Sequence, residues 1–236
     1  MRVKLTFSYD GTDFFGSQTQ KHTSKTVLGT LTHVLRKLGV NSIPVASGRT
    51  DSGVHALAQV CHLDLPPFWS DLKKLKETLN TMLPSSIHIR RITRVSDDFH
   101  ARYSAKSRLY RYVLSTKESS PFSSRYVTHM PEADFEKICQ NIKIFEGKHD
   151  FEYFQKKGSD VKTTTREIYK AFAYKHKEYI ILCFEANGFL RSQVRLMCGA
   201  LLTLEAKHIE EMLQKEEKHK IKPVPPQGLY LAKIKY

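Results

Sequence analysis

The sequence predicts an α+β fold, and three observations support that class. Segments of alternating apolar residues are typical of strands, segments with apolar residues at helical spacing are typical of helices, and both kinds are mixed along the chain. The chain has 236 residues, of which 40% are apolar and 26% charged. A chain of this length and composition can bury a substantial core and is neither disordered nor fibrous.

The first hundred residues contain six predicted elements. In order, these are a strand at residues 3–9, a helix at 27–38, strands at 43–47 and 54–65, a helix at 72–83 and a strand at 87–95. The first strand ends at the turn sequence YDGTDFFG. Ser24 is a plausible N-cap and Gly39 a plausible end for the first helix. This order is close to a ferredoxin-like split βαβ unit.

The rest of the chain predicts a second set of elements in a similar order. These are a strand at 108–114, a helix around 135–142, a strand hairpin at 166–175 and 178–186, a helix at 189–204 and a closing strand within 223–236. The aromatic stretch GKHDFEYF is expected in the core. The similar order suggests duplication of one unit, with a boundary near residues 100–107.

The charge balance favours a polyanionic partner. The chain carries 38 Lys and Arg against 24 Asp and Glu, a formal net charge of +14. A surplus spread over the whole chain is typical of proteins that hold RNA or DNA, and charge does not distinguish the two. The alternative is a basic composition that serves solubility alone.

Cysteine usage and hydropathy indicate the compartment. The four cysteines are widely scattered without a CxxC pair, which argues against a zinc site or a disulfide framework and predicts a reducing cytoplasm. The N-terminal MRVKLTFSYD lacks the apolar centre of a signal peptide. No apolar run approaches the ~20 residues that cross a bilayer, so no membrane association is expected.

The loop SGRTDSGVHA at residues 47–56 is a first candidate site. TDSG is a good turn, so Asp51 could simply cap a backbone N–H. Arg49 offers another interpretation, because side chains two apart in an extended segment share a face and could pair. Pairing would keep Asp51 ionised, as a nucleophile requires.

Two further constellations contain aromatic or basic side chains. In RLYRYV, Tyr110 and Tyr112 share one strand face beside arginines, either as core packing or as a platform for an unstacked RNA base. In NGFLRSQVRLM, Arg191 and Arg195 stand at i and i+4 and are either solvated or clamp a phosphate or a carboxylate. His55, His62, His88 and His100 are scattered without metal-ligand spacing, and neither a metal nor a small-molecule cofactor is expected.

Six motifs in a fixed order carry a resemblance to a known family. They are GRTDSGVHA at 48–56, FHARYSAKSRLYRY at 99–112, then GKHDF, TTREI, ANGFLRSQVR and QGLYL. In these motifs, and in their order from nearly the first residue to the last, the chain resembles the TruA-type tRNA pseudouridine synthases.

The resemblance implies a role for five residues. Asp51 would be the nucleophile, Tyr110 the tyrosine that stacks on the target uracil, and Arg195 the arginine that pairs with the aspartate. Arg49 would contact phosphate and displace the base, and Leu229 would line the uracil pocket. The implied reaction is isomerisation of uridines 38, 39 and 40 in the tRNA anticodon stem-loop, by a homodimer without a cofactor.

The resemblance also implies an architecture. Two ferredoxin-like halves, residues 1–104 with the aspartate and 105–236 with the tyrosine and its arginine, would join in one continuous antiparallel sheet. Helices would lie on one side of that sheet, and a basic active-site cleft would lie between the halves.

Four positions depart from the family pattern, and other functions compete with catalysis. Ser17 stands where Trp is common, Ser52 where Ala is commoner, and Gln193 and Leu196 replace Met and Asn. A non-catalytic RNA-binding protein would keep the basic surface and lose the carboxylate, which is present here. A DNA-binding module would need a recognition helix that the sequence does not offer. The Lys-rich residues 215–222 are either an RNA contact or a solvated loop.

Overall fold

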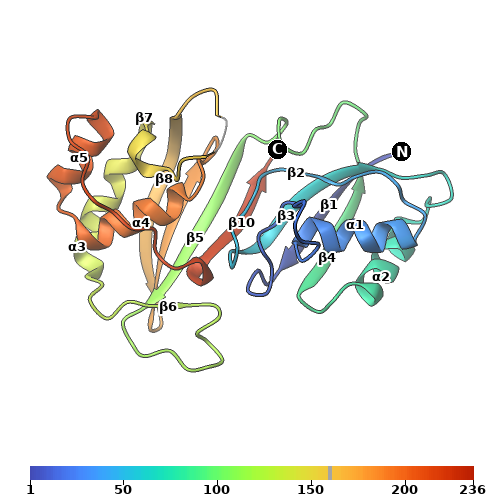
Figure 1. Cartoon of the computed structure of the whole chain (residues 1–236), viewed down its shortest axis with the longest axis horizontal. Helices are drawn as coiled ribbons and strands as arrows, with labels where there is room; N and C mark the ends of the chain where they lie inside the picture. The colour runs from blue at the N-terminus through green and yellow to red at the C-terminus, as the bar shows by residue number, and fades with distance from the viewer. Residues whose placement is uncertain (159–160) are drawn as a thin grey trace. The chain divides into compact units, whose positions relative to one another are not determined.

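The computed structural model describes residues 1–158 and 161–236 and has a mixed α+β fold (Figure 1). The described residues form a large, mostly antiparallel sheet and five α-helices. They divide into two compact units: unit 1 comprises residues 1–106 with 231–236, and unit 2 comprises 107–230. None of the helices in these described ranges is long and apolar enough to cross a lipid bilayer.

Unit 1 is built on the strand β1 (Arg2–Tyr9). It pairs antiparallel with β3 (His55–Asp64) on one side and with β4 (Ile87–Arg94) on the other. The short strand β2 (Val45–Ala46) adds to β3, and β10 (Leu229–Lys235) brings its last residues into this unit. The predicted order of strand, helix, two strands, helix and strand is confirmed.

The helices α1 (Val27–Lys37) and α2 (Leu72–Met82) contact each other in unit 1. Their buried leucines join the alternating face of β1; Leu5, Leu31 and Leu75 are fully buried. Each such side chain stabilises the fold by roughly 1.5–3 kcal/mol. The predicted N-cap Ser24 is wrong, because Thr26 has the extended backbone of a cap and accepts the Gly29 N–H.

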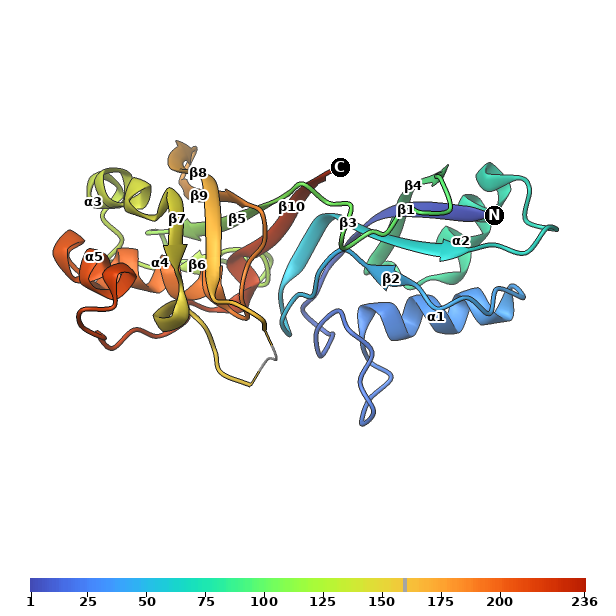
Figure 2. The same cartoon turned by 90° about the horizontal axis from the view of Figure 1, so that it is seen from above.

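The strands of unit 2 form an antiparallel set around β9 (Tyr179–Ala186). This strand pairs with β5 (Ser107–Ser115) and with β8 (Thr165–His176), and β8 pairs with the edge strand β7 (Gly147–Asp150) (Figure 2). The strand β6 (Thr128–His129) runs parallel to β5. The predicted hairpin is confirmed, with its turn at Lys177 in the left-handed region (φ 55°).

The helices α3 (Phe135–Asn141), α4 (Gln193–Thr203) and α5 (Ala206–Gln214) gather in unit 2 (Figures 1 and 2). In the described part of the chain, three 3₁₀ turns connect the elements, at Ile142–Phe145, Glu152–Phe154 and Pro226–Gly228. Phe151 and Phe154 are fully buried, as expected for the aromatic stretch, although its first four residues form β7. The expected helix at 189–204 begins only at Gln193, because Ser192 has a left-handed backbone (φ 59°).

Candidate active site

The loop between β2 and β3 holds Arg49 and Asp51 in unit 1. Asp51 is half-buried and Arg49 is exposed. The Val54 N–H donates to the Asp51 carbonyl at 3.2 Å, and Gly53 has a φ of +76°, so the predicted turn is confirmed. The turn reverses the chain directly after the carboxylate and leads into β3.

Thr50 lies between Arg49 and Asp51 in the sequence and hydrogen-bonds to two buried residues, Ser17 and Tyr9. The Ser17 hydroxyl accepts the Thr50 N–H at 2.8 Å, and the Ser17 N–H donates to the Thr50 carbonyl at 3.1 Å. The Tyr9 hydroxyl hydrogen-bonds to the Thr50 hydroxyl at 2.7 Å. Burial raises the pKa of Tyr9 to about 12, so its hydroxyl is neutral at physiological pH. The backbone immediately before Asp51 is therefore fixed on both its N–H and its carbonyl.

The start of the loop is fixed by a buried amide. Ser47 donates its hydroxyl to Gln59 Oε1 at 2.8 Å, and Gln59 Nε2 donates to the Gly48 carbonyl at 3.1 Å. The Val60 N–H also donates to Gln59 Oε1. Because Gln59 lies on β3, the loop is tied to the sheet that follows it, which is how a rigid scaffold presents a site.

The segment YDGTDFFG packs directly against this loop. A Cβ on Gly11 would overlap the Val54 carbonyl. Gly16 has a φ of +91°, and a Cβ added there would lie 3.0 Å from the Thr50 carbonyl oxygen. Ser52 donates its hydroxyl to the Phe14 carbonyl at 3.0 Å. Sequence reasoning treated this segment only as a turn. Its two glycines were the available signal of a close backbone approach.

The two tyrosines of β5 have different surroundings in unit 2. Tyr112 is fully buried, and its hydroxyl hydrogen-bonds to Thr128 Oγ1 at 2.8 Å and to the Pro225 carbonyl at 3.1 Å. Burial raises the pKa of Tyr112 well above its usual value. Tyr110 is half-buried, with its ring edge-to-face against Phe189 at 5.2 Å between centroids. Of the two residues, Tyr110 alone is partly exposed to solvent.

Arg195 lies in the first turn of α4 and is braced by a loop of the same unit. Its Nε donates to the Val224 carbonyl at 2.7 Å, and the Val224 N–H donates to the Arg195 carbonyl at 3.2 Å. The prediction that Arg191 and Arg195 share one face of a helix is wrong, because Arg191 precedes α4. It is exposed, and its Nη1 donates to the Lys157 carbonyl at 3.3 Å.

Leu229, the remaining predicted site residue, is buried in unit 2, as are Gln193 and Leu196, two positions expected to depart from the family pattern. Leu229 begins β10 and is 6% exposed. Gln193 is buried, and its Oε1 accepts the Leu190 N–H at 2.8 Å, which secures the entry to α4. Leu196 is also buried. These two departures therefore pack inside the unit that carries Arg195.

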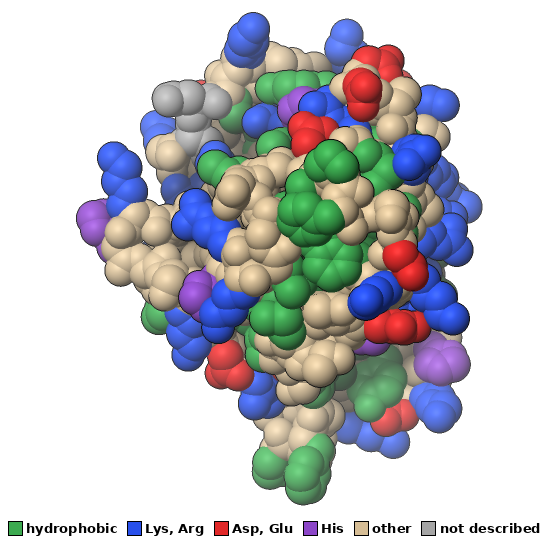
Figure 3. Space-filling model, turned by 90° about the vertical axis from the view of Figure 1, so that its right-hand side faces the viewer, with side chains coloured by type: hydrophobic (Ala, Val, Ile, Leu, Met, Phe, Trp, Pro, Cys, Tyr) green, Lys and Arg blue, Asp and Glu red, His purple; other side chains and the backbone are tan. Residues whose placement is uncertain are grey.

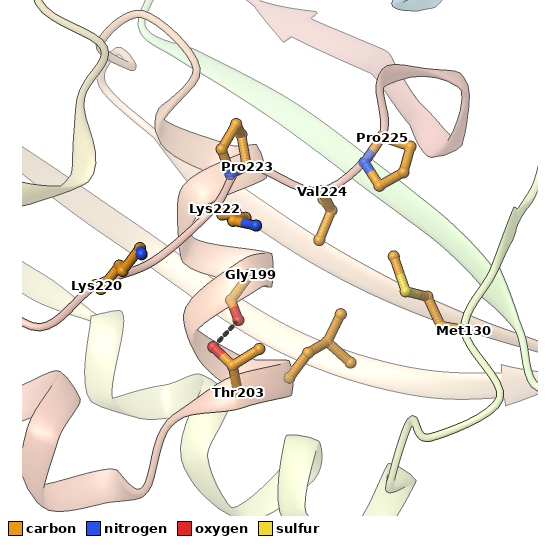
Figure 4. A pocket seen from close by; sticks show the side chains of 9 residues that line it. Met130, Gly199, Thr203, Lys220, Lys222, Pro223, Val224 and Pro225 are labelled. Carbon is orange, nitrogen blue, oxygen red and sulfur yellow. Dashed lines mark hydrogen bonds between the residues drawn. The ribbon is translucent and has the colours of Figure 1, made fainter.

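A cavity of about 460 Å³ lies beside the segment that braces Arg195 (Figure 4). Met130, Pro223, Val224 and Pro225 line it together with Gly199, Leu202, Thr203, Lys220 and Lys222. A Cβ on Gly199 would overlap the Lys222 carbonyl, so α4 and this segment lie in close contact. None of the five predicted site residues lines the cavity.

Basic side chains are spread over the face of the molecule that Figure 3 shows. The face in Figure 3 shows many Lys and Arg and fewer Asp and Glu. Within the Lys-rich residues 215–222, Lys215 is committed to Asp150 and Glu152, each at 2.8 Å from its Nζ. This lysine is thus engaged inside unit 2.

Comparison with known proteins agrees with the motifs. The family model described as tRNA pseudouridine synthase matches residues 5–104 and 142–236. A protein named tRNA pseudouridine synthase A from Campylobacter jejuni (strain RM1221) is 40% identical, with 100% of both chains covered. The proteins of that name from Wolinella succinogenes and Geobacillus sp. (strain WCH70) are 41% and 39% identical, covering 97% and 100% of this chain and 92% and 98% of their own. The chain belongs to the tRNA pseudouridine synthase family, a family of isomerases.

Proposed function

We propose that this protein converts uridine to pseudouridine at positions 38, 39 and 40 of the tRNA anticodon stem-loop. The observation that carries the proposal is Asp51, which sits in the family's GRTD motif on a loop fixed by Ser17, Tyr9 and Gln59. A carboxylate presented on such a fixed loop is suited to attack on a positioned substrate. A protein that only bound RNA would have no need of a carboxylate held in this way.

The reaction requires neither oxidation nor reduction. The bond from N1 to C1′ breaks, the uracil turns, and C5 bonds to C1′, while the C5 proton leaves and N1 gains a proton. Asp51 is the group that acts on the ribose, either as a nucleophile at C1′ or as a base at C2′ that gives a glycal. Both routes need the carboxylate in its ionised form.

The other residues hold the base and the charge. Tyr110 stacks on the detached uracil and assists removal of the C5 proton, and its half-buried ring against Phe189 supports that role. Arg195 pairs with Asp51 and keeps it ionised in a partly dry site, and its bond to Val224 would hold the guanidinium in position. Arg49 contacts a phosphate and displaces the base, and Leu229 lines the uracil pocket.

The assembly that this function needs combines both units. The two ferredoxin-like halves, 1–104 and 105–236, join one continuous antiparallel sheet with helices on one side, and a basic cleft between them receives the flipped nucleotide. Extruding a nucleotide costs a few kcal/mol, and the cost is lowest for a nucleotide that is already unpaired in a loop. A homodimer holds one tRNA, in the cytoplasm.

The experiment that tests this function maps the product. Unmodified anticodon stem-loop transcripts carry a single uridine at position 38, 39 or 40, with cytidine at the other two. After incubation, nucleoside mass spectrometry should find pseudouridine in all three and none in a transcript with cytidine at every position. Pseudouridine that appears only outside these positions would contradict the proposed target, and none in any tRNA would contradict the proposed activity.

A further inference from the structure

A cluster of two histidines and one glutamate lies in unit 2 among residues that have no part in the proposed reaction. The donor atoms of His208, Glu211 and His219 all lie within 4.8 Å of one another. Glu211 Oε2 and His219 Nε2 are 2.7 Å apart, and the rings of His208 and His219 have centroids 4.4 Å apart. All three side chains are partly buried.

Two of the three come from one face of α5. His208 and Glu211 are three positions apart, which places their side chains on the same side of the helix. His219 stands eight residues beyond Glu211, where no common ligand spacing would suggest a metal. The fold, and not the spacing, brings it to the other two.

The turn that returns His219 to α5 is held independently of the cluster. Lys215 ends the helix in the left-handed region (φ 64°), and the Glu216 N–H donates to the Glu211 carbonyl at 2.9 Å. The two ion pairs of Lys215, with Asp150 and Glu152, fix the same corner. The three donor groups are therefore close together before any ion arrives, which lowers the entropic cost of binding.

The chemistry of this donor set suits a borderline metal ion. Two imidazoles and a carboxylate are the three protein ligands of many zinc sites, with water in the fourth position. Ligands at 2.0–2.2 Å from a tetrahedral ion lie about 3.4 Å apart, so the cluster needs only small side-chain adjustments.

The Lys207 ammonium group lies near the Glu211 carboxylate. Lys207 Nζ lies 3.5 Å from Glu211 Oε1, the oxygen other than the one that contacts His219. This lysine is 82% exposed at its side chain, so it can move away from an incoming ion without loss of a buried contact.

We propose that His208, Glu211 and His219 form a zinc site that fastens the segment after α5 to the helix. The site lies on unit 2 and serves its stability rather than the chemistry at Asp51. It would hold the residues that continue towards Val224, which braces Arg195.

The experiment is a titration of the metal-free full-length protein, without a histidine tag, with zinc chloride in a calorimeter. We expect one zinc ion per chain, and a rise in melting temperature of about 5 °C when zinc is in large excess over the dissociation constant. Cobalt(II) in place of zinc should give the visible absorption of a low-symmetry site with nitrogen ligands.

Variants separate the cluster from adventitious binding. His208→Gln, Glu211→Gln and His219→Gln should each weaken zinc binding by more than about tenfold and abolish the thermal shift. The matched controls are His176→Gln, an exposed histidine of β8, and Glu210→Gln, the exposed neighbour of Glu211; both should bind zinc as the unaltered protein does. Circular dichroism of the metal-free variants establishes that they are folded. Absence of zinc binding, or binding that His219→Gln leaves unchanged, would overturn the proposal.

Discussion

Ser17 and Thr50 exchange two hydrogen bonds across 33 positions of the chain, one through the serine hydroxyl and one through its N–H. Both residues are buried, and Asp51 follows directly. The Ser17 hydroxyl accepts the buried Thr50 N–H, so this donor is satisfied by a side chain. The geometry of the aspartate is thus tied to a side chain in a different segment.

Replacing Ser17 should impair catalysis more than tRNA binding. Ser17→Ala removes the acceptor of a buried N–H, which costs about 1–3 kcal/mol of unfolding free energy. The shift of the loop should lower kcat by about tenfold or more, because small displacements of a reacting group have large effects. Denaturant unfolding measures the loss of stability, steady-state kinetics measure kcat, and a tRNA titration measures the binding, which should change less.

Ser52→Ala is the matched control for that change. Ser52 also donates a hydroxyl to the loop's support, but it is exposed, so water replaces the lost bond. Its stability and kcat should stay close to those of the unaltered protein. Equal losses in the two variants would contradict the role given to Ser17.

Gly11 and Gly48 should differ greatly in how much the same substitution to alanine changes stability. Gly11→Ala would place a methyl group on the Val54 carbonyl, so we expect destabilisation of about 3 kcal/mol or more. Gly48→Ala meets no atom within 4 Å and should change stability by no more than about 0.5 kcal/mol. Thermal denaturation of the two proteins decides this, and a stable Gly11→Ala protein would show that the two loops do not depend on their close approach.

Substitutions at Tyr110 and Tyr112 should separate an effect on the reaction rate from an effect on stability. Tyr110→Ala removes a stacking surface worth about 1–3 kcal/mol per base, so single-turnover rates should collapse while the melting temperature changes little. Tyr112→Phe leaves Thr128 and the Pro225 carbonyl without their buried partner and should cost about 1–2 kcal/mol of stability with activity retained at low temperature. The reverse pattern would mean that Tyr112, not Tyr110, faces the substrate.

Alkaline pH should loosen the support of the active-site loop. The folded pKa of Tyr9 is about 12 against 10 for an exposed tyrosine, so the folded state binds its proton more tightly. The unfolding free energy that the protonated Tyr9 hydroxyl contributes is therefore complete below pH 10 and is lost as the pH rises through 12. The expected loss is about 2–3 kcal/mol. Tyr9→Phe should reduce this fall in unfolding free energy between pH 9 and 12, and an unchanged fall would contradict the assignment.

The elements with strong periodicity could be predicted from the sequence. The alternation of Val3, Leu5 and Phe7 and the helical spacing from Val27 to Leu35 each matched the structure, because one face of each element is buried. The helix α5 was not predicted, although its buried Ile209, Met212 and Leu213 stand at helical spacing. The short strands β6 and β7 were missed because pairing, not their own pattern, defines them.

The candidate site, too, could be predicted from the sequence only in part. The turn after Asp51 could be predicted because Gly53 and Ser52 specify it locally. The buried bonds from Ser17, Tyr9 and Gln59 could not, because they join residues that only the folded sheet brings together. His219 near Glu211 is a further contact of this kind.

The central claim is that Asp51 performs the isomerisation, and tritium release tests it most directly. Transfer RNA labelled with 5-tritiated uridine is incubated with the unaltered protein, with Asp51→Asn and with Asp98→Asn, whose carboxyl is exposed in the same unit. We expect release from the first and third proteins, and none from Asp51→Asn although it binds tRNA with unchanged affinity. Release by Asp51→Asn at the rate of the unaltered protein would contradict the account.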